Sequence, residues 1–319
     1  MQWYAGLIAF LISWALIPLL RRVALKWGFV DLPNQRKIHH EPLPLLGGVA
    51  IFAGFVGATL TSYHSFSSAH KMYLGLLIGA ALLFGIGLVD DFAKSRGRDF
   101  PAMPRFIIQI VAASCVAGFG GTVKGFTSPF GHSHFVVLPP PISILVTIVW
   151  IVGVVNVFNF LDGLDGLAAG IAAISAVTLL FIALVKGDIP SAIWAISLAG
   201  SALGFLKHNF YPARIIMGDA GSTVIGFLLA SIAVIGAFKS ATVISIFVPI
   251  LALGVPIFDA VRVVLRRALS GKPVYKPDKT HVHHRLLDAG LSQVQTVAVM
   301  YLISVCFSLA SMIVALSQR

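Results

Sequence analysis

The sequence predicts an all-α membrane protein whose chain crosses the bilayer about ten times. The first observation is composition: 58% of the 319 residues are hydrophobic and only 11% are charged, whereas about a quarter of the residues of a soluble domain are charged. The second is a mean hydropathy of +0.93, with apolar residues gathered in runs long enough for a helix to cross the hydrocarbon layer. The third is an uneven distribution of Lys and Arg between alternate loops.

Ten apolar runs follow one another, and we treat residues 1–319 as a single integral membrane domain. The expected spans are 3–20, 45–62, 73–89, 106–121, 142–160, 164–185, 190–207, 220–237, 241–262 and 295–316. The first run has no basic residue before it and is followed by Arg21 and Arg22, so we expect a transmembrane helix there and not a signal peptide. An even number of spans leaves both termini on the same side.

Basic residues give the orientation. The loops after the first, third, fifth, seventh and ninth spans contain 18 of the 23 Lys and Arg residues. Such residues accumulate on the cytoplasmic side of membrane proteins, so both termini are predicted to be extracytoplasmic. The net charge of +11 would suggest a nucleic-acid partner in a soluble protein. Here membrane orientation explains it, and we expect no nucleic acid.

Acidic residues follow the basic ones to the same side. Eleven of the twelve Asp and Glu residues lie on or near the predicted cytoplasmic face, and Asp188 is the exception. Carboxylates contribute little to orientation, so their position needs another cause. A shared polar site on the cytoplasmic face is the simplest one, and we place the active site there.

Asp90 and Asp91 end the third span. Carboxylates at a helix C-terminus face the negative end of the macrodipole, which costs up to about 1 kcal/mol. One interpretation is a solvated loop start in which Lys94, Arg96 and Arg98 supply local ion pairs. The other is a carboxylate pair that binds Mg²⁺ or removes a proton.

Four polar residues recur every third position at the end of the fifth span: Asn156, Asn159, Asp162 and Asp165. Gly163 and Gly166 argue against one continuous helix, and we expect a turn from 162 to 166 into the next span. Asp165 could cap that next helix. Capping would explain one of the four residues but not all of them.

Two further motifs lie on the same predicted face. Gly218, Asp219 and Ser222 precede the eighth span, where glycines and a helix N-terminus suit an anion or an ordinary helix start. His281, His283, His284 and Arg285 form a basic cluster, in which zinc is the minor interpretation and a nucleotide diphosphate the major one. We expect Asp259 to pair with Arg262. A loop with Arg36, Lys37 and His39 adds further cations before the second span.

Taken in order, these motifs resemble the polyprenyl-phosphate N-acetylhexosamine-1-phosphate transferases over nearly the whole chain. The matching residues are Arg36-Lys37-x-His39, Asp90-Asp91, Gln109, Asn156-x-x-Asn159-x-x-Asp162-Gly163-x-Asp165-Gly166, Pro212-Ala213-Arg214, Met217-Gly218-Asp219-x-Gly221-Ser222, Asp278 and His281-x-His283-His284-Arg285. The histidine motif is similar to that of the N-acetylglucosamine-type branch. One departure is Arg105, where many relatives have Lys; Arg can anchor phosphate but cannot exchange a proton.

The resemblance implies transfer of a sugar-1-phosphate, GlcNAc-1-phosphate by base rate, from a UDP-sugar to undecaprenyl phosphate with release of UMP. Other UDP-N-acetylhexosamines stay open. It implies Mg²⁺, with Mn²⁺ as a substitute, on Asn159 and Asp219, and a catalytic role for Asp90, Asp91 and Asp162. It assigns substrate binding to Arg36, Lys37, His39, Arg105, Asn156, Asp165, Gly218, Ser222, His281, His283, His284 and Arg285.

The implied location is the bacterial cytoplasmic membrane, as a multi-pass protein in contact with the bilayer, with a homodimer left open. The product would initiate assembly of a cell-envelope polysaccharide such as O-antigen, common antigen or teichoic acid. A cation-coupled transporter is the main alternative of another class, because intramembrane acids often mark ion paths. Transporter sites tend toward the bilayer midplane, whereas these acids gather at helix ends. A CDP-alcohol phosphatidyltransferase also repeats Asp-Gly, but its signature continues differently after Asp165-Gly166.

Overall fold

Helices make up nearly all of the regular structure. The computed structural model describes residues 3–31, 42–66, 69–127, 135–236, 244–269 and 281–317. The helices are α1 (Tyr4–Trp27), α2 (Gly47–Thr61), α3 (His70–Ser95), α4 (Ala102–Gly118), α5 (Pro140–Leu161), α6 (Leu167–Val185), α7 (Ile189–Asn209), α8 (Gly218–Gly236), α9 (Ile244–Ala252), α10 (Gly254–Leu269), α11 (Val282–Asp288) and α12 (Gln293–Leu316), with a 3-10 turn, η1 (Tyr63–Phe66).

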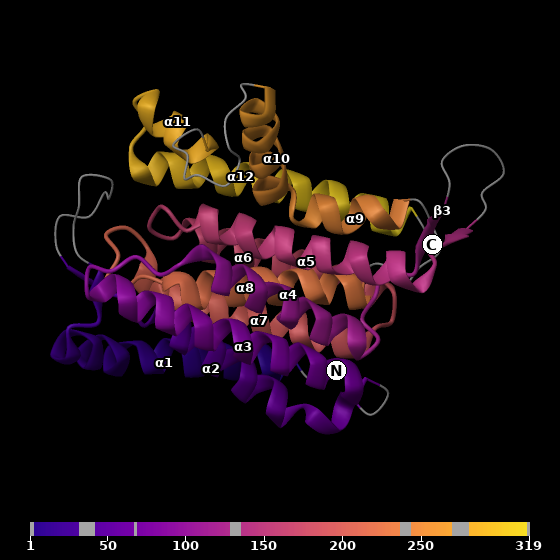
Figure 1. Cartoon of the computed structure of the whole chain (residues 1–319), viewed down its shortest axis with the longest axis horizontal. Coiled ribbons are helices and arrows are strands. Elements are labelled where there is room, and N and C mark those ends of the chain that lie inside the picture. The colour runs from indigo at the N-terminus through magenta and orange to yellow at the C-terminus, as the bar shows by residue number, and fades with distance from the viewer. Residues whose placement is uncertain are drawn as a thin grey trace.

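Two short antiparallel strand pairs lie in the loops at opposite ends of the bundle. β1 (Val30–Asp31) pairs with β2 (Leu43–Pro44), and β3 (Gly125–Thr127) pairs with β4 (Phe135–Val137). Figure 1 shows the long helices running alongside one another between these ends. The start of α1 and the end of α12 lie at the same end of the bundle (Figure 1).

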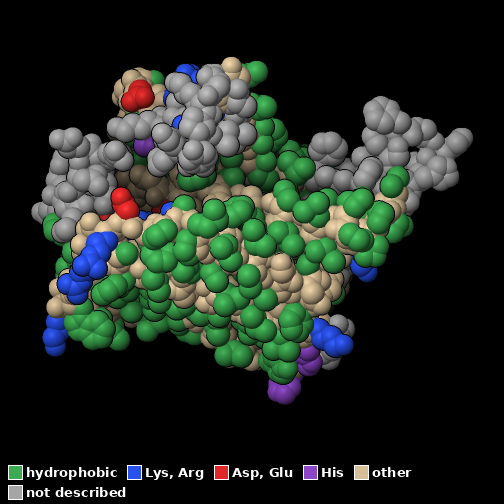
Figure 2. Space-filling view, in the orientation of Figure 1, with side chains coloured by type: hydrophobic (Ala, Val, Ile, Leu, Met, Phe, Trp, Pro, Cys, Tyr) green, Lys and Arg blue, Asp and Glu red, His purple; other side chains and the backbone are tan. Residues whose placement is uncertain are grey.

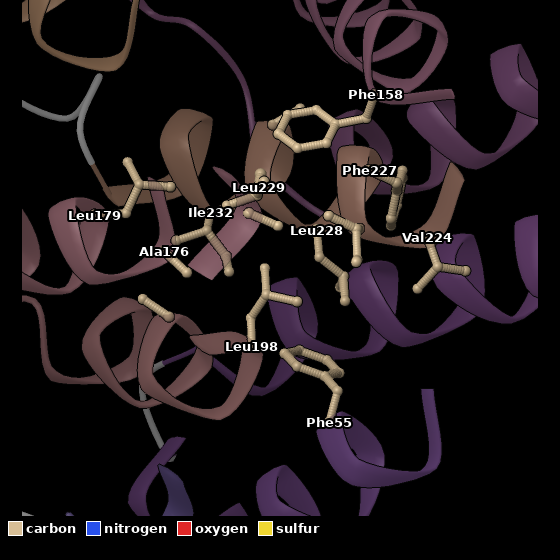
Figure 3. Close-up of a cluster of buried hydrophobic side chains, with 14 of the residues drawn as sticks. Phe55, Phe158, Ala176, Leu179, Leu198, Val224, Phe227, Leu228, Leu229 and Ile232 are labelled. Atoms are coloured by element: carbon tan, nitrogen blue, oxygen red, sulfur yellow. The ribbon is translucent and has the colours of Figure 1, made fainter. Parts of the chain in front are cut away.

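Helix α8 is the centre of the bundle. It contacts α2, α3, α5, α6 and α7, and of its residues only Asp219 is not buried. Figure 3 shows Phe227, Leu228 and Leu229 of α8 among Phe158 of α5 and Leu198 of α7. Because protein surrounds α8 on all sides, this helix is positioned by side-chain packing and not by lipid.

Glycines let the helices approach α8 at its N-terminal end. A Cβ atom on Gly87 of α3 would overlap the backbone of Ala220, and one on Gly48 of α2 would overlap that of Gly221. Small residues of this kind permit backbone-to-backbone contact between membrane helices. As a result the last turns of α3 meet the first turn of α8, which brings Asp90 and Asp91 beside Asp219.

The chain is a multi-pass membrane protein. Seven of the described helices are long and apolar enough to cross a bilayer: α1, α3, α5, α6, α7, α8 and α12. Two shorter apolar helices, α2 and α4, occupy the predicted spans 45–62 and 106–121. Figure 2 shows hydrophobic side chains covering the flank of the bundle, which is the surface that lipid would contact.

The expectation of one continuous span over 241–262 is wrong. The chain forms α9 up to Ala252 and a separate helix α10 from Gly254, which lies across the direction of α9 in Figure 1. Pro256 has no N–H with which to bond the carbonyl of Ala252, so the helix cannot continue regularly there. Gly254 allows the turn to pack against the ring of Phe307, where a Cβ would stand 2.6 Å from Cγ.

Candidate active site

Four charged side chains from three helices meet at one end of the bundle. Asp90 and Lys94 lie on the last turns of α3, Arg105 on the first turn of α4, and Asp219 at the start of α8. We call these four residues the charge cluster. Figure 2 shows acidic, basic and histidine side chains beside a hollow at this end of the molecule.

Each carboxylate of the charge cluster contacts both cations. Lys94 Nζ lies 3.2 Å from Asp90 Oδ2 and 2.8 Å from Asp219 Oδ1. Arg105 Nη1 donates to Asp90 Oδ2 at 2.8 Å and to Asp219 Oδ2 at 3.0 Å. Asp90 is 1% exposed, and its Oδ1 is buried with no hydrogen-bond partner within the described structure. Two paired cations therefore keep two carboxylates together that would otherwise repel.

Asp91 has a different role from Asp90, because it contacts the backbone of α8. Its Oδ1 accepts the backbone N–H of Asp219 at 2.8 Å and its Oδ2 accepts that of Ala220 at 3.0 Å. These N–H groups have no partner within α8, so a completely buried carboxylate from α3 caps the N-terminus of α8. Gly218, at φ 72°, leaves the room that this carboxylate occupies, because a Cβ there would overlap it. Asp91 thus fixes the backbone that carries Asp219.

Amide side chains from α5 continue the site. Asn156 Nδ2 donates to Gln109 Oε1 at 2.7 Å, and Gln109 Nε2 donates back to Asn156 Oδ1 at 3.4 Å. Asn159 Nδ2 donates to Ser222 Oγ at 3.0 Å, and Ser222 in turn donates to the carbonyl of Gly218. Because the amide nitrogen of Asn159 faces Ser222, its Oδ1 points away from Ser222. That oxygen can serve as a ligand for a hard cation.

Asp162 ends α5 and begins the turn that the glycines predict. It is half-buried. Burial raises the pKa of the Asp162 carboxyl to about 7; the charge of Asp219 adds to this rise and Lys94 opposes it. A carboxyl with a pKa in this range exchanges a proton readily at neutral pH.

The expectation that Asp165 caps α6 is wrong. The residue before α6 is Gly166, at φ 79° and with no side-chain cap. Asp165 Oδ2 instead accepts the backbone N–H of Ala213 at 2.9 Å. Asn209 Oδ1 accepts the N–H of Gly166, and Tyr301 donates its hydroxyl to the Gly166 carbonyl at 2.6 Å. Long-range bonds therefore hold the 162–166 turn, with Asp165 as one of its anchors.

The histidine motif lies against the same turn. A Cβ on Gly163 would stand 3.1 Å from His283 Nε2, and the His281 ring stacks on that of His283 and lies near Phe160. Burial, with smaller contributions from His284 and His281, lowers the pKa of His283 to about 3, so this imidazole is neutral at pH 7. His284 packs on His283, and Arg285 is exposed on the next helical position.

Asp259 pairs with His281 and not, as expected, with Arg262. Its Oδ2 lies 2.8 Å from His281 Nδ1, and its Oδ1 accepts the backbone N–H of Val282 at 2.9 Å. The break between α9 and α10 brings this buried carboxylate to the start of α11. Since Nδ1 faces a carboxylate, His281 carries its proton there and presents Nε2 elsewhere.

The structure brings most of the predicted site residues to this end of the bundle. They are Asp90, Asp91, Arg105, Asn156, Asn159, Asp162, Asp165, Gly218, Asp219, Ser222, His281, His283, His284 and Arg285. Arg36, Lys37 and His39 lie outside the described residues. Sequence reasoning assigned Lys94 only a local pair and did not find Asn209 or Tyr301. The spacing of Lys94 from Asp90, four residues on one helix face, is the signal that could have included it.

The side chains fit a hard divalent cation. Asp90, Asn159 and Asp219 offer oxygen atoms, which Mg²⁺ prefers, and one of these oxygens, Asp90 Oδ1, is buried without a partner within the described structure. In the described part of the chain no three acidic, histidine or cysteine side chains converge as a ready-made metal site. Mg²⁺ commonly binds one or two carboxylates together with substrate phosphates, so such an incomplete donor set is in keeping with Mg²⁺.

The helical bundle and the cluster of charged side chains at one end of it are those of a polytopic membrane protein with a polar centre, and ionisable residues in such a place usually mark a functional site. The chain belongs to glycosyl transferase family 4, whose pattern matches residues 73–237.

Three relatives extend the similarity over nearly the full length. The chain is 36% identical over 310 residues to the probable undecaprenyl-phosphate N-acetylglucosaminyl 1-phosphate transferase of Bacillus subtilis, covering 96% of this chain and 84% of that protein. It is 36% identical to the decaprenyl-phosphate N-acetylglucosaminephosphotransferase of Mycobacterium tuberculosis, covering 93% and 78%. It is 29% identical to the undecaprenyl-phosphate alpha-N-acetylglucosaminyl 1-phosphate transferase of Yersinia pestis, covering 97% and 82%.

Proposed function

We propose that this protein transfers GlcNAc-1-phosphate from UDP-GlcNAc to undecaprenyl phosphate in the bacterial cytoplasmic membrane. The products are UMP and a lipid-diphosphate-linked sugar that initiates a cell-envelope polysaccharide. The charge cluster carries the proposal, because it combines carboxylates and cations at a helix end, where a lipid headgroup and a water-soluble nucleotide can meet. The names of the relatives, which give undecaprenyl or decaprenyl phosphate and N-acetylglucosamine phosphate, support the lipid acceptor and the transferred group.

The reaction forms one bond and breaks one. An oxygen of the lipid phosphate attacks the β-phosphorus of the UDP-sugar, and UMP leaves with the bridging oxygen. Phosphoryl transfer depends on charge neutralisation and in-line positioning. Lys94 and Arg105 supply positive charge for the phosphates, and Asn159 with Asp219 would hold Mg²⁺. When bound, Mg²⁺ neutralises charge that develops on the leaving phosphate.

Two carboxyls can remove the proton from a singly ionised lipid phosphate. Asp90 lies in the charge cluster beside Arg105, the proposed phosphate anchor, and Asp162 has a pKa near neutrality. We assign the lipid phosphate to Asp90 and the proton exchange with bulk water to Asp162. We assign the nucleotide sugar to the histidine motif beside the 162–166 turn, which consists of His281, His283, His284 and Arg285. His283 acts there as a neutral imidazole.

We prefer direct attack by the lipid phosphate over a covalent phospho-enzyme, because that phosphate is already an anion and a covalent step gains little. Incubation of the enzyme with UDP-sugar in the absence of lipid should leave every carboxyl unmodified. A phospho-aspartate detected by mass spectrometry would overturn this preference.

UMP release tests the proposed function. Purified protein would be given Mg²⁺, undecaprenyl phosphate and each of several UDP-N-acetylhexosamines, and UMP and the glycolipid would be measured. UDP-GlcNAc should give both products in equal amounts. Absence of UMP with every sugar, from protein that unfolds cooperatively on heating, would reject the proposal.

The pH dependence of the rate should report on Asp162. Its raised pKa means that the proton-accepting carboxylate forms only as the pH rises through about 7, so kcat/KM should rise across this range. Asp162→Asn should lower the rate and remove this limb, whereas Asp188→Asn at the opposite end should retain it. If kcat/KM of Asp162→Asn still rose with pH around the same midpoint as in the wild type, another group would be the one that titrates.

Asp259 should act through His281. Asp259→Asn should raise the KM for the UDP-sugar about tenfold, but have little further effect in a His281→Gln background. Such a double-mutant cycle should give a coupling of about 1–2 kcal/mol. Arg262→Gln, on the same helix, is the matched control and should leave KM unchanged. If the effects of Asp259→Asn and His281→Gln on KM were additive, Asp259 would only cap α11.

A further inference from the structure

We infer that Tyr301 is a positioning residue for the nucleotide sugar: its hydroxyl fixes helix α12, and with it the histidine motif on α11, against the 162–166 turn. The inference rests on the proposed function, which assigns the nucleotide sugar to that motif. Tyr301 lies in the first half of α12 and binds the turn through a backbone carbonyl. It would therefore act on the substrate through the groups that it holds in place.

The contact between Tyr301 and the turn has a defined geometry. The Tyr301 hydroxyl donates to the Gly166 carbonyl at 2.6 Å, within the range of a good hydroxyl bond. Helix α6 leaves room for this side chain at Gly170, where a Cβ atom would overlap the hydroxyl and the ring. On the other side of the residue, the Gly166 N–H donates to Asn209 Oδ1 at 2.9 Å. Side chains from α7 and α12 therefore hold both backbone polar groups of Gly166.

A tightly bonded connection joins α11 to α12. Gly290, at φ 94°, and Leu291 donate their N–H groups back to carbonyls of α11 in the pattern of a Schellman motif. Ser292 and Gln295 then form a capping box at the start of α12, in which each side chain accepts the backbone N–H of the other residue. Because these bonds fix the connection, α11 should move together with α12.

The histidine motif itself contacts the same turn. A Cβ atom on Gly163 would stand 3.1 Å from His283 Nε2. The first residue of the motif, His281, is held separately by Asp259 of α10. The distance between the motif and the turn is therefore set from two places, at α10 by Asp259 and at α12 by Tyr301.

The hydroxyl matters because much of the inward face of α12 is small. Its buried residues include Thr296, Ser304, Ser308 and Ser311. Residues of this size let helices approach closely, but they interlock little along the helix axis, whereas a hydrogen bond has a preferred length and direction. The Gly166 carbonyl also accepts the Gly170 N–H at 2.9 Å. Loss of the Tyr301 hydroxyl would leave that carbonyl paired, so α12 should shift slightly and the fold should be retained.

Tyr301→Phe tests the inference, because it removes the hydroxyl and keeps the ring. The KM for UDP-GlcNAc should rise about tenfold, equivalent to about 1.4 kcal/mol, while kcat and the KM for undecaprenyl phosphate should change less than about twofold. The charge cluster lies on α3, α4 and α8, whereas α12 packs on α6 and α9, so the chemical step should be spared. Calorimetry on the full chain with UDP-GlcNAc and Mg²⁺, without lipid, should show the same loss of affinity.

Tyr73→Phe is the matched control. The Tyr73 hydroxyl is also buried and donates to Thr59 Oγ1 at 2.8 Å, but it lies near the start of α3, whereas Asp90 lies near the end of that helix. This variant should lose about as much thermal stability as Tyr301→Phe and keep the wild-type KM for UDP-GlcNAc. In an Arg285→Ala background, Tyr301→Phe should raise this KM by a smaller factor, because α11 has already lost part of its hold on the nucleotide.

Wild-type affinity for UDP-GlcNAc in a folded Tyr301→Phe, equal losses of kcat and of affinity for both substrates, or full additivity with Arg285→Ala would each refute the positioning role. Normal UMP release by the wild type would then leave the proposed function intact. Weaker UDP-GlcNAc binding by Tyr301→Phe, beside a wild type that releases no UMP with any sugar, would reject the function and keep the positioning role. A folded wild type that does not bind UDP-GlcNAc would contradict both.

Discussion

Asp219→Ala should abolish turnover at every Mg²⁺ concentration. The substitution removes the carboxylate that both Lys94 and Arg105 contact and that we propose as a metal ligand. Loss of one preorganised electrostatic group in an active site costs about 100- to 1000-fold in rate. Here a metal ligand and the partner of two cations disappear together, so we expect a loss of at least about 1000-fold.

The measurement is UMP release during a Mg²⁺ titration carried to saturation. Asp188→Ala, which removes a carboxylate at the opposite end of the bundle, should retain wild-type activity. Asp219→Asn should fall between the wild type and Asp219→Ala, because an amide oxygen is still a ligand but carries no charge. Recovery of the full rate by added metal in Asp219→Ala would show that this carboxylate is not an essential ligand.

Asp91→Ala should lower stability and activity together, although Asp91 need not touch a substrate. Two buried N–H groups at the start of α8 lose their acceptor, and each unpaired buried group costs about 1–3 kcal/mol. The freed turn carries Asp219, so a small shift there also misplaces the charge cluster. We expect a rate loss of about 100-fold, in line with other misplaced catalytic groups.

Thermal unfolding and UMP release, measured on the same preparation, separate this role from direct chemistry. Asp162→Asn is the matched comparison, because Asp162 lies in a turn and its side chain caps no helix in the described structure. It should lower the rate without a comparable loss of stability. Wild-type stability in Asp91→Ala would refute the capping role.

The sequence could predict that most residues of the candidate site lie at one end of the bundle, because this follows from a global property of the chain. Acidic residues that gather on one face, without an orientational reason to do so, indicate a shared site whatever the packing of the helices. The helical bundle was predictable for a similar reason, since hydropathy alone requires most of these runs to be helical. The proposed reaction and the proposed roles of the residues came from the similarity of the motifs to a known family.

The partners of individual residues could not be predicted. Asp91 and Asp219 are 128 residues apart in the chain, and no local spacing indicates that one caps the helix of the other. Asp259 was assigned to Arg262 because that residue is close in sequence, whereas its real partner, His281, lies 22 residues away beyond a break between helices. Hydropathy also missed this break, since Gly254 and Pro256 lie within the stretch 246–258, which has no polar side chain.

The contact of Gly87 and Gly48 with the backbone of α8 has an evolutionary consequence. At these two glycines the approach of α3 and of α2 to α8 is set by main chain against main chain, so it does not depend on the size of a side chain at either contact. The outer surfaces of α1 and α12 can then change freely to suit thicker, thinner or differently charged bilayers. A lineage could adapt to a new membrane without retuning its catalytic centre, provided that these two glycines stay glycine.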